Sequence, residues 1–419
     1  MLYRESGDFS TTYQQDGQTF PIKFDRYRYY ALMAVAFLAV PFLVNDYWVN
    51  AIFLPFLIYS IAAIGLNILT GYCGQVSLGT GGFMAVGAYA CYKLMTGFPE
   101  VNIFFHIILS GGITAAVCVL FGLPSLRIKG FYLAVATLAA QFFLVWLFNK
   151  VSWFYNYSAS GQINAPERTI FGYAITGPEV MPWVAYLFCL AFTAASAIIA
   201  RNLTRGSAGR KWMAIRDMDI AAEIIGVDPL RAKLSAFAIS GFFVGISGAL
   251  FFAVYLGAVE VGEVFGIVKS FLVLFMIIIG GLGSIFGSFA GAAFLVLLPV
   301  MLKLALADNV EVSTASDVAS WIFFYIAAAS FVLLVVALVQ KIIGKGGGLA
   351  ILWGGVAVVS FFASALLGGG LGWPTDIVAH LQLMIIGLLI VIFLIMEPHG
   401  LAQLWRVAKE KLRLWPFPH

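Results

Sequence analysis

The sequence predicts an all-α, polytopic transmembrane helical bundle whose N- and C-termini both lie in the cytoplasm. Three observations support this fold class. Hydrophobic residues make up 62% of the chain and charged residues only 11%, which is more apolar surface than a soluble core needs. Continuous apolar stretches of about 20 residues, the length that crosses the hydrocarbon of a bilayer, recur along the chain. Cations gather in every second connection between these stretches.

The apolar stretches predict a bundle of about 10–12 spans, each long enough for the hydrocarbon layer. Their apolar residues run continuously instead of alternating, so membrane strands are not expected. The predicted spans lie near residues 29–44, 47–69, 77–97, 103–123, 130–149, 182–200, 233–257, 266–283, 285–303, 321–340, 349–369 and 380–397.

The charge distribution predicts how these spans are oriented. If the N-terminus is cytoplasmic and twelve spans follow, all but five of the 24 cations fall on the inner side. The cations that remain outside are Lys93, Lys150, Arg168, Lys269 and Lys303. Such a bias is typical of helical membrane proteins and supports an even number of spans. The net charge of +4 therefore concerns orientation against membrane lipid, and no nucleic-acid partner is predicted.

The chain divides into four regions. Residues 1–28 form a polar cytoplasmic extension without the apolar core and cleavage site of a signal peptide, and residues 29–303 form the core membrane domain. Residues 304–379 hold an external loop and an extra pair of apolar helices. Residues 380–419 hold the last span and a basic, aromatic cytoplasmic tail that fits the surface of the inner leaflet. Within the core domain, residues 150–181 are either an ordered external cap or a plain loop.

Nothing in the sequence predicts catalysis, a metal or a cofactor. The histidines are scattered, and no Ser/His/Asp or paired-carboxylate arrangement follows from the spacing. The sequence GLGSIFG joins two apolar stretches, whereas a dinucleotide site needs a strand, a turn and a helix. The cysteines lack CxxC spacing and are expected to be buried packing residues: Cys73, Cys91, Cys118 and Cys189.

A charged segment at residues 201–233, inside the core domain, predicts a cytoplasmic docking helix over residues 208–226. It carries seven cations and four carboxylates between two apolar stretches. Gly226, followed by Asp228-Pro229, is predicted to end the helix. Such a helix suits the transmission of force from a partner; the alternative is a solvated loop that only fixes topology. Apolar side chains recur there at an approximate helical spacing, at Trp212, Ile215, Ile220, Ile224 and Ile225.

Two Gly-rich stretches lie at residues 65–90 and 280–294. In the second, Gly283, Gly287 and Gly291 recur at every fourth position, as Gly241 and Gly245 do elsewhere, which favours close approach of helices in lipid. The first stretch mixes glycine with polar side chains, which are tolerated at membrane depth when they are buried in protein or line a cavity. It therefore either lines the substrate path or only packs helices together. The path candidates are Asn67, Gly74, Gln75, Ser77, Gly79 and Thr80.

Several of these motifs, in this order, resemble the inner-membrane permeases of branched-chain amino acid ABC importers, most closely the M-type subunit. The resemblance covers roughly residues 60–300 and 380–410. It is carried by GLNILTGYCGQVSLGTGGFMAVGAYA, IKGFYLAVATLAAQ, GRKWMAIRDMDIAAEIIGVDPLRAKLSAFAISGFFVGISGAL, IIIGGLGSIFGSFAGAAFLVLLP and MEPHGLAQLW. Residues 304–379 depart from the family, many of whose members have a shorter connection there.

The resemblance implies a multi-pass protein of the bacterial inner membrane that is not itself an enzyme. Its expected partners are a sister permease in a heterodimer, two cytoplasmic ATPase subunits and a periplasmic solute-binding protein. The expected cargo is leucine, isoleucine or valine, or a related amino acid or amide. Gly71 and Leu78 also belong to the Gly-rich signature. Residues expected to couple the chain to the ATPase are Trp212, Ala214, Ile215, Arg216, Asp219, Ala221, Ala222, Glu223 and Gly226.

The alternative function is a stand-alone secondary carrier or channel for a small polar or zwitterionic solute. Carriers of this kind usually place ionisable groups within their spans to couple ions. The predicted spans hold almost none near mid-membrane, which weakens this alternative. A purely structural membrane scaffold is a third possibility, and it predicts no solute uptake that depends on the chain.

Overall fold

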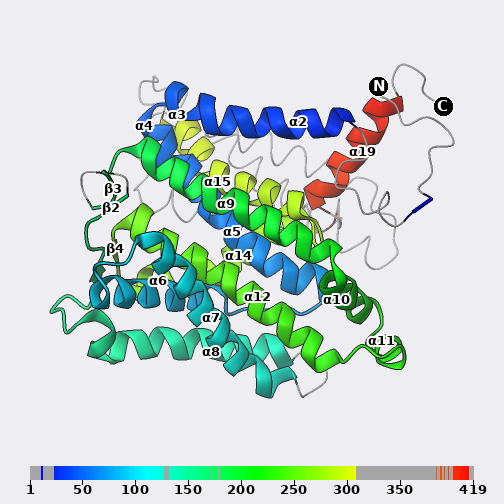
Figure 1. The fold of residues 1–419 in the computed structure, drawn as a ribbon, viewed down its shortest axis with the longest axis horizontal. Helices are drawn as coiled ribbons and strands as arrows, with labels where there is room; N and C mark the ends of the chain where they lie inside the picture. Colours follow the sequence, from blue (N-terminus) through cyan, green and yellow to red (C-terminus); the bar gives the residue numbers. More distant parts are fainter. Residues whose placement is uncertain are drawn as a thin grey trace, which may run out of the picture. The chain divides into compact units, whose positions relative to one another are not determined.

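The structure of the chain, drawn in Figure 1, is a computed structural model. The chain divides into two compact units. The first unit comprises Met1–Val296 and Ile390–His419, and the second comprises Leu297–Leu389. The predicted spans at 321–340 and 349–369, and almost all of the one at 380–397, lie outside the described part of the chain. The structure describes residues 11–12, 23–126, 132–170, 172–177, 180–307, 384, 387–388, 391, 395 and 400–414.

Each of the nine spans predicted before residue 304 is helical in the structure, which confirms the polytopic helical bundle. Six helices in the described part are long and apolar enough to cross a membrane, and two shorter apolar helices lie at Tyr29–Phe42 and Ile285–Met301. The helices of the first half are α2 (Lys23–Ala34), η1 (Val35–Ala39), α3 (Val40–Leu43), α4 (Asp46–Trp48), η2 (Val49–Phe53), α5 (Leu54–Asn67), η3 (Ile68–Tyr72), α6 (Thr80–Gly97), α7 (Ile103–Leu126), α8 (Tyr132–Lys150) and η4 (Ser152–Tyr155).

The second half continues the bundle and adds short helices in its connections. α10 and α11 lie in the connection between α9 and α12 (Figure 1), and α13 lies between η5 and α14. The helices of this half are α9 (Pro182–Arg205), α10 (Ser207–Asp217), α11 (Asp219–Ile224), α12 (Pro229–Leu250), η5 (Phe251–Leu256), α13 (Val261–Val264), α14 (Ile267–Gly280), α15 (Ile285–Ala307) and α19 (Gly400–Leu414).

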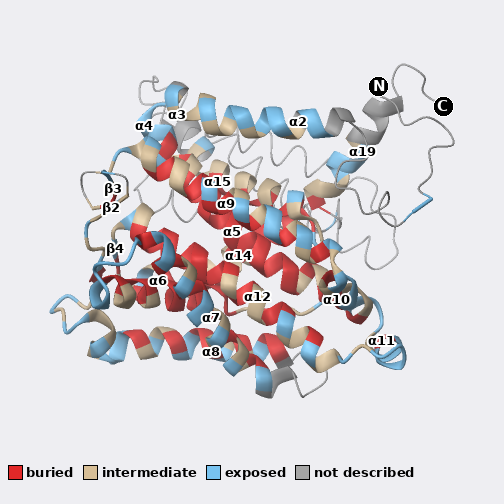
Figure 2. Cartoon of the chain, viewed as in Figure 1, coloured by how far each residue is buried: buried red, intermediate tan, exposed pale blue. Residues whose placement is uncertain are grey.

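The core of the bundle forms around α12, which packs against α5, α6 and α7. Figure 2 shows buried residues gathered on these facing sides. The span Asp46–Tyr72, which contains α5, is 89% buried, whereas Ile103–Leu123 and Leu133–Lys150 are only 39% buried. The helices α7 and α8 therefore turn one side outward, and Trp146 of α8 lies exposed on that side. Exposed aromatic side chains of this kind fit a lipid-facing surface.

Glycines bring the core helices into backbone contact. A Cβ on Gly245 of α12 would overlap the side chain of Thr114 in α7, and a Cβ on Gly87 of α6 would overlap the backbone of Gly245. A Cβ on Gly248 would overlap the backbone of Met84. Gly287 makes a similar contact between α14 and the start of α15. The predicted close approach at small residues is therefore confirmed.

Two pairs of short antiparallel strands lie at one end of the bundle. β1 (Ile163–Asn164) pairs antiparallel with β4 (Ala258–Val259), and β2 (Arg168–Ile170) pairs with β3 (Tyr173–Thr176). Of the two alternatives for residues 150–181, the ordered cap is the correct one. The span Pro229–Leu256 separates β4 from α11, and its 28 residues extend about 42 Å at the helical rise. The strands and the α10–α11 segment thus lie at opposite ends of the bundle (Figure 1).

Two helices begin inside the bundle instead of at its surface. The first turn of α6 donates from the Gly82 N–H to the side chain of Gln141, which lies at the middle of the span Leu133–Lys150. The first turn of α14 carries Lys269, which donates to Tyr59. Tyr59 lies 13 residues from either end of the span Asp46–Tyr72. Both helices therefore start at about half the depth of their neighbours.

Candidate functional site

The charged segment forms two short helices that meet at an elbow. Met218 separates α10 from α11 with an extended backbone, at φ −162° and ψ 100°. The prediction of one continuous helix over 208–226 is therefore wrong, because the apolar spacing runs on through an elbow that no Gly or Pro marks. Gly226, at φ 88°, follows the end of α11 as predicted. Asp228 then caps the first turn of α12.

Trp212 fastens α10 to the bundle. Its side chain is fully buried, at 0% exposure, and its Nε1–H donates to Ser235 Oγ of α12 at 3.0 Å. Ile215 is buried as well, and Ala214 is half-buried beside it. Truncating a buried tryptophan costs about 3–5 kcal/mol, so this contact is strong enough to make α10 move with α12.

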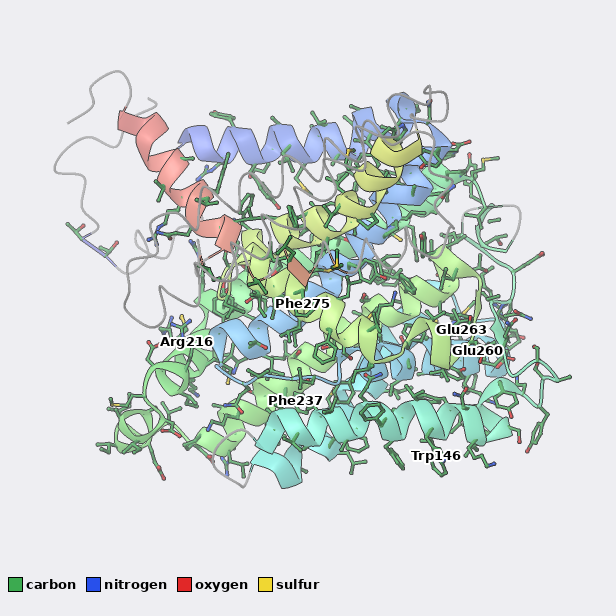
Figure 3. The ribbon with its side chains drawn as sticks, turned by 180° about the vertical axis from the view of Figure 1, so that it is seen from behind. Trp146, Arg216, Phe237, Glu260, Glu263 and Phe275 are labelled. Atoms are coloured by element: carbon green, nitrogen blue, oxygen red, sulfur yellow. The ribbon has the colours of Figure 1, made fainter. Side chains whose placement is uncertain are left out.

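Arg216 links α10 to both Gly-rich stretches (Figure 3). Its Nη1 donates to the Gly71 carbonyl oxygen at 2.8 Å, and its Nη2 lies 3.0 Å from Asp217 Oδ1. Gly71 lies in η3, at the C-terminal end of a long helix, where carbonyl groups lack helical partners and the dipole is negative. Gly74 and Gly283, both with positive φ, flank the arginine, and a Cβ on Gly74 would come within 3.0 Å of the Arg216 Cγ.

Asn67 locks α5 to the turn between α14 and α15. Its Oδ1 accepts a hydrogen bond from the Gly283 N–H at 2.8 Å. Its Nδ2 donates to the Ser284 carbonyl at 2.8 Å and to Ser288 Oγ at 2.9 Å. The side chain is buried, and both of its polar atoms form hydrogen bonds. These bonds join α5 to the turn between α14 and α15, which is distant in the sequence. Its assignment to the substrate path stays a prediction.

An exposed apolar surface lies on the outer side of the elbow. This elbow patch consists of Met218, Ile220, Ile224 and Ile225, of which Ile224 is 81% exposed. The predicted apolar stripe therefore divides: its first part faces the bundle and its second part faces away. A cluster of large apolar side chains at the surface marks an interaction site more often than a solvated loop.

The remaining predicted coupling residues surround this patch. All three of the following residues belong to α11: Ala222 is buried, whereas Ala221 and Glu223 are exposed. Asp219 approaches Lys233 of α12, with 3.7 Å between the carboxylate and the ammonium. The structure thus brings these residues onto one projecting element, but it leaves their role in coupling untested.

The irregular segment 73–79 carries the chain from Arg216 into the middle of the bundle. The Gln75 N–H donates to the Leu69 carbonyl at 3.0 Å, and its side chain is half-buried. Ser77 is buried and accepts a hydrogen bond from the Gly79 N–H at 3.4 Å. A Cβ on Gly79 would come within 2.6 Å of the Thr137 carbonyl oxygen, so this position needs glycine. Gln75, Ser77 and Gly79 therefore lie along one irregular segment, which runs from the end of the bundle to its middle.

Side chains from other helices hold the start of α6. The Gly81 N–H donates to Ser270 Oγ at 2.7 Å, and the Gly82 N–H donates to Gln141 Oε1. Gln141 Nε2 in turn donates to the Phe265 carbonyl at 2.8 Å. Thr80, the first residue of α6, is buried, and its hydroxyl has no hydrogen-bond partner among the described residues. The polar groups at this helix start are thus only partly satisfied.

Sequence reasoning missed Gln141, Ser270 and Lys269. The charge count assigned Lys269 to the outer side, at the start of the span predicted at 266–283, whereas the structure places it beside the middle of α5. Hydropathy cannot detect this, because the chain after β4 folds back into the bundle before the helix begins. A lone glutamine in the middle of an apolar span is a signal that does point to Gln141.

Cys73 follows the predicted packing role. It is buried, and burial raises the pKa of its thiol to about 12, although the charge of Lys233 opposes this shift. The thiol therefore stays protonated and unreactive at neutral pH. The other three cysteines are also free and buried. No group of three metal-binding side chains occurs in the part of the chain that the structure describes.

Comparisons with known proteins identify the family. The profile of the family described as "Branched-chain amino acid transport system / permease component" matches residues 49–316. The high-affinity branched-chain amino acid transport system permease protein LivM of Salmonella typhimurium (strain LT2) is 33% identical over 287 residues, which covers 63% of this chain and 66% of the relative. LivM of Escherichia coli (strain K12) gives the same identity and coverage.

The chain thus spans slightly less than two thirds of the length of these relatives. No solved structure matches it. The matched region contains the elbow, both Gly-rich stretches and the two helices that begin at half depth. With its long apolar helices, the chain is a multi-pass protein of the inner membrane. It belongs to the family of branched-chain amino acid transport system permease components.

Proposed function

We propose that this chain is a permease subunit of an ATP-driven importer that moves branched-chain or related hydrophobic amino acids across the bacterial inner membrane. It acts with a sister permease in a heterodimer, with two cytoplasmic ATPase subunits and with a periplasmic solute-binding protein. The relatives are named as permease proteins of a branched-chain amino acid transport system, which supports this cargo class.

The observation that carries the proposal is the bond between Arg216 and the Gly71 carbonyl. It connects a segment with an exposed apolar patch to the point where a long helix gives way to an irregular chain. A displacement of the elbow patch by a partner is therefore transmitted to the interior of the bundle through Arg216. Trp212 supplies the second connection, to α12.

In this mechanism the ATPase subunits dock on residues 208–226 and ATP changes their separation. A partner shifts the permease between two states only as far as it binds one state better than the other. The elbow patch provides apolar contact, and Glu223 beside it offers charge for the register of docking. Hydrolysis takes place in the partner chains, so this chain contributes the path and the linkage.

Reconstitution tests the proposal. The chain and its partner subunits are placed in liposomes with loaded binding protein outside, ATP inside and ion gradients clamped by ionophores. Uptake of radiolabelled L-leucine that requires ATP and the binding protein is the expected result. A stand-alone carrier would instead concentrate leucine in vesicles that hold this chain alone under an imposed ion gradient, and that outcome would refute the proposal.

A further inference from the structure

Lys269 is an ionisable side chain at half the depth of the bundle. Its Nζ donates to Tyr59 Oη at 2.6 Å, at the midpoint of the span Asp46–Tyr72. The ammonium also lies 4.7 Å from the ring centroid of Phe251 and 5.2 Å from that of Tyr59. A charge within a membrane span is costly and usually marks a substrate or ion pathway.

The surroundings of this ammonium lack an anion. Among the described residues, no carboxylate lies within ion-pair distance of Lys269. Of its three N–H donors, one is used by Tyr59. The faces of two aromatic rings attract a cation but replace only part of its lost hydration. A bound anion would complete this site.

Two helix N-termini meet beside Lys269. α14 begins two residues before it, and the N–H of Gly81 in the first turn of α6 donates to Ser270 Oγ at 2.7 Å. Neither first turn carries an acidic residue. Each N-terminus bears a partial positive charge, and discontinuous membrane helices use such ends to hold anionic groups of a substrate.

Thr80 supplies an independent observation at the same place. Its hydroxyl is buried at 1% exposure, opens the first turn of α6 and has no hydrogen-bond partner among the described residues. A buried hydroxyl without a partner loses its hydrogen bonds to water and gains none in return. A ligand with acceptor oxygens, bound at the junction of the two first turns, would satisfy it.

We propose that Lys269, with the first turns of α14 and α6, binds the α-carboxylate of the transported amino acid. The aromatic faces of Phe251 and Tyr255, whose ring centroids lie 5.2 Å apart, contact the apolar side chain of the cargo. Lys269 is only half-buried, so part of its side chain is reachable from the surface of this chain. The inference rests on the proposed function and names the group in that path that recognises the cargo.

Lys93 provides a matched control. Its ammonium lies 4.1 Å from the ring centroid of Trp153 and donates to Asn156 Oδ1, so it too is a half-buried lysine on an aromatic ring. It lies in the last turns of α6, near the strand end of the bundle, and the proposed site does not include it. A variant of Lys93 therefore removes only a lysine–aromatic contact, whereas the same variant of Lys269 also removes the proposed partner of the carboxylate.

The experiment uses the complete complex in liposomes with saturating leucine-loaded binding protein. The variants are Lys269→Met, Lys269→Arg and Lys93→Met, and the readout is the amount of L-leucine moved per ATP hydrolysed. We expect Lys269→Met to lower this ratio at least about 30-fold, the equivalent of ~2 kcal/mol of lost carboxylate binding. Lys269→Arg, which keeps the charge, should retain at least about a tenth of the ratio, and Lys93→Met should stay within about twofold of wild type.

Co-purification of the partner subunits with each variant separates a defect in assembly from a defect in transport. If Lys269→Met assembles and moves leucine at the wild-type ratio, the inference fails while the proposed function stands. An equal loss in Lys93→Met would also overturn it, because the effect would then be structural. If the wild-type complex moves no branched-chain amino acid, the proposed function itself fails. Should Lys269→Met not assemble, Lys269→Arg decides the question: the inference requires this variant to retain at least about a tenth of the wild-type ratio, and it fails if the variant assembles and retains less.

Discussion

Arg216 and Gly71 are 145 positions apart in the sequence and are joined by a hydrogen bond of 2.8 Å. The arginine projects from α10, at one end of the bundle, and the carbonyl belongs to the helix that leads into the irregular segment 73–79. One side chain therefore connects the surface on which a partner can press with the chain that enters the interior.

Replacing Arg216 by alanine should uncouple transport. We expect ATP-dependent leucine uptake to fall about tenfold, or ~1.4 kcal/mol, near the lower end for a hydrogen bond from a charged group because Arg216 is partly exposed. Arg231→Ala is the control, since the Arg231 side chain is 89% exposed and pairs only locally with Asp228. Uptake at the wild-type rate in Arg216→Ala would show that this bond transmits nothing.

Ile224→Asp should prevent docking without unfolding the chain. Ile224 is exposed, so an aspartate there has little effect on the fold, but a central apolar contact in an interface is often worth ~2 kcal/mol or more. Binding of the purified ATPase subunits, measured by co-sedimentation with liposomes, should weaken about 30-fold. Tyr157→Asp, at an equally exposed site near the strands, should bind normally. Equal binding by both variants would place the docking surface elsewhere.

Asn67→Leu should destabilise the protein, whereas Gln75→Leu should not. Leucine at position 67 leaves the buried Gly283 N–H without its partner, and each such group costs about 1–3 kcal/mol. Gln75 is only half-buried, and its described hydrogen bonds come from the backbone. Thermal unfolding in detergent should show a lower Tm for Asn67→Leu alone. Equal Tm values would remove the structural role of Asn67 and favour its place in the substrate path.

Gly248→Ala should also be destabilising, because the new methyl group would overlap the Met84 backbone. Overpacking of this kind typically costs about 1–3 kcal/mol, and backbone atoms have little freedom to move aside. Gly112→Ala is the matched control: it lies in α7 with nothing within 4 Å of the added Cβ. That variant should be neutral or slightly stabilised, since alanine is the better helix former. Unfolding midpoints in a chaotrope would decide between these outcomes.

Much of the fold was predictable because the bilayer requires each span to contain about 20 continuous apolar residues. Continuous apolar stretches placed nine helices correctly, and the small residues at Gly245 and Gly287 predicted close approach of helices at those positions. The helix stop at Gly226 followed from local backbone chemistry. These are properties of single segments, and a sequence displays them directly.

The site was less predictable because its features depend on contacts between distant segments. Met218 carries no turn signal, so the elbow arises from packing: Trp212 is drawn onto α12 while Ile224 faces away. Lys269 reads as a cation at the outer end of the predicted span 266–283 until the fold shows that its helix begins at half depth. The partners of Asn67 lie more than 200 positions away, which no local pattern reveals.

The backbone contacts at Gly87, Gly245 and Gly248 have a consequence for how this membrane protein can change shape. Helices that meet without intervening side chains cannot glide past one another by switching rotamers. α6, α7 and α12 must therefore travel as one rigid block, and any bending has to occur at hinges outside it. Gly74, at positive φ in the segment that leads into α6, is one position at which that block can pivot.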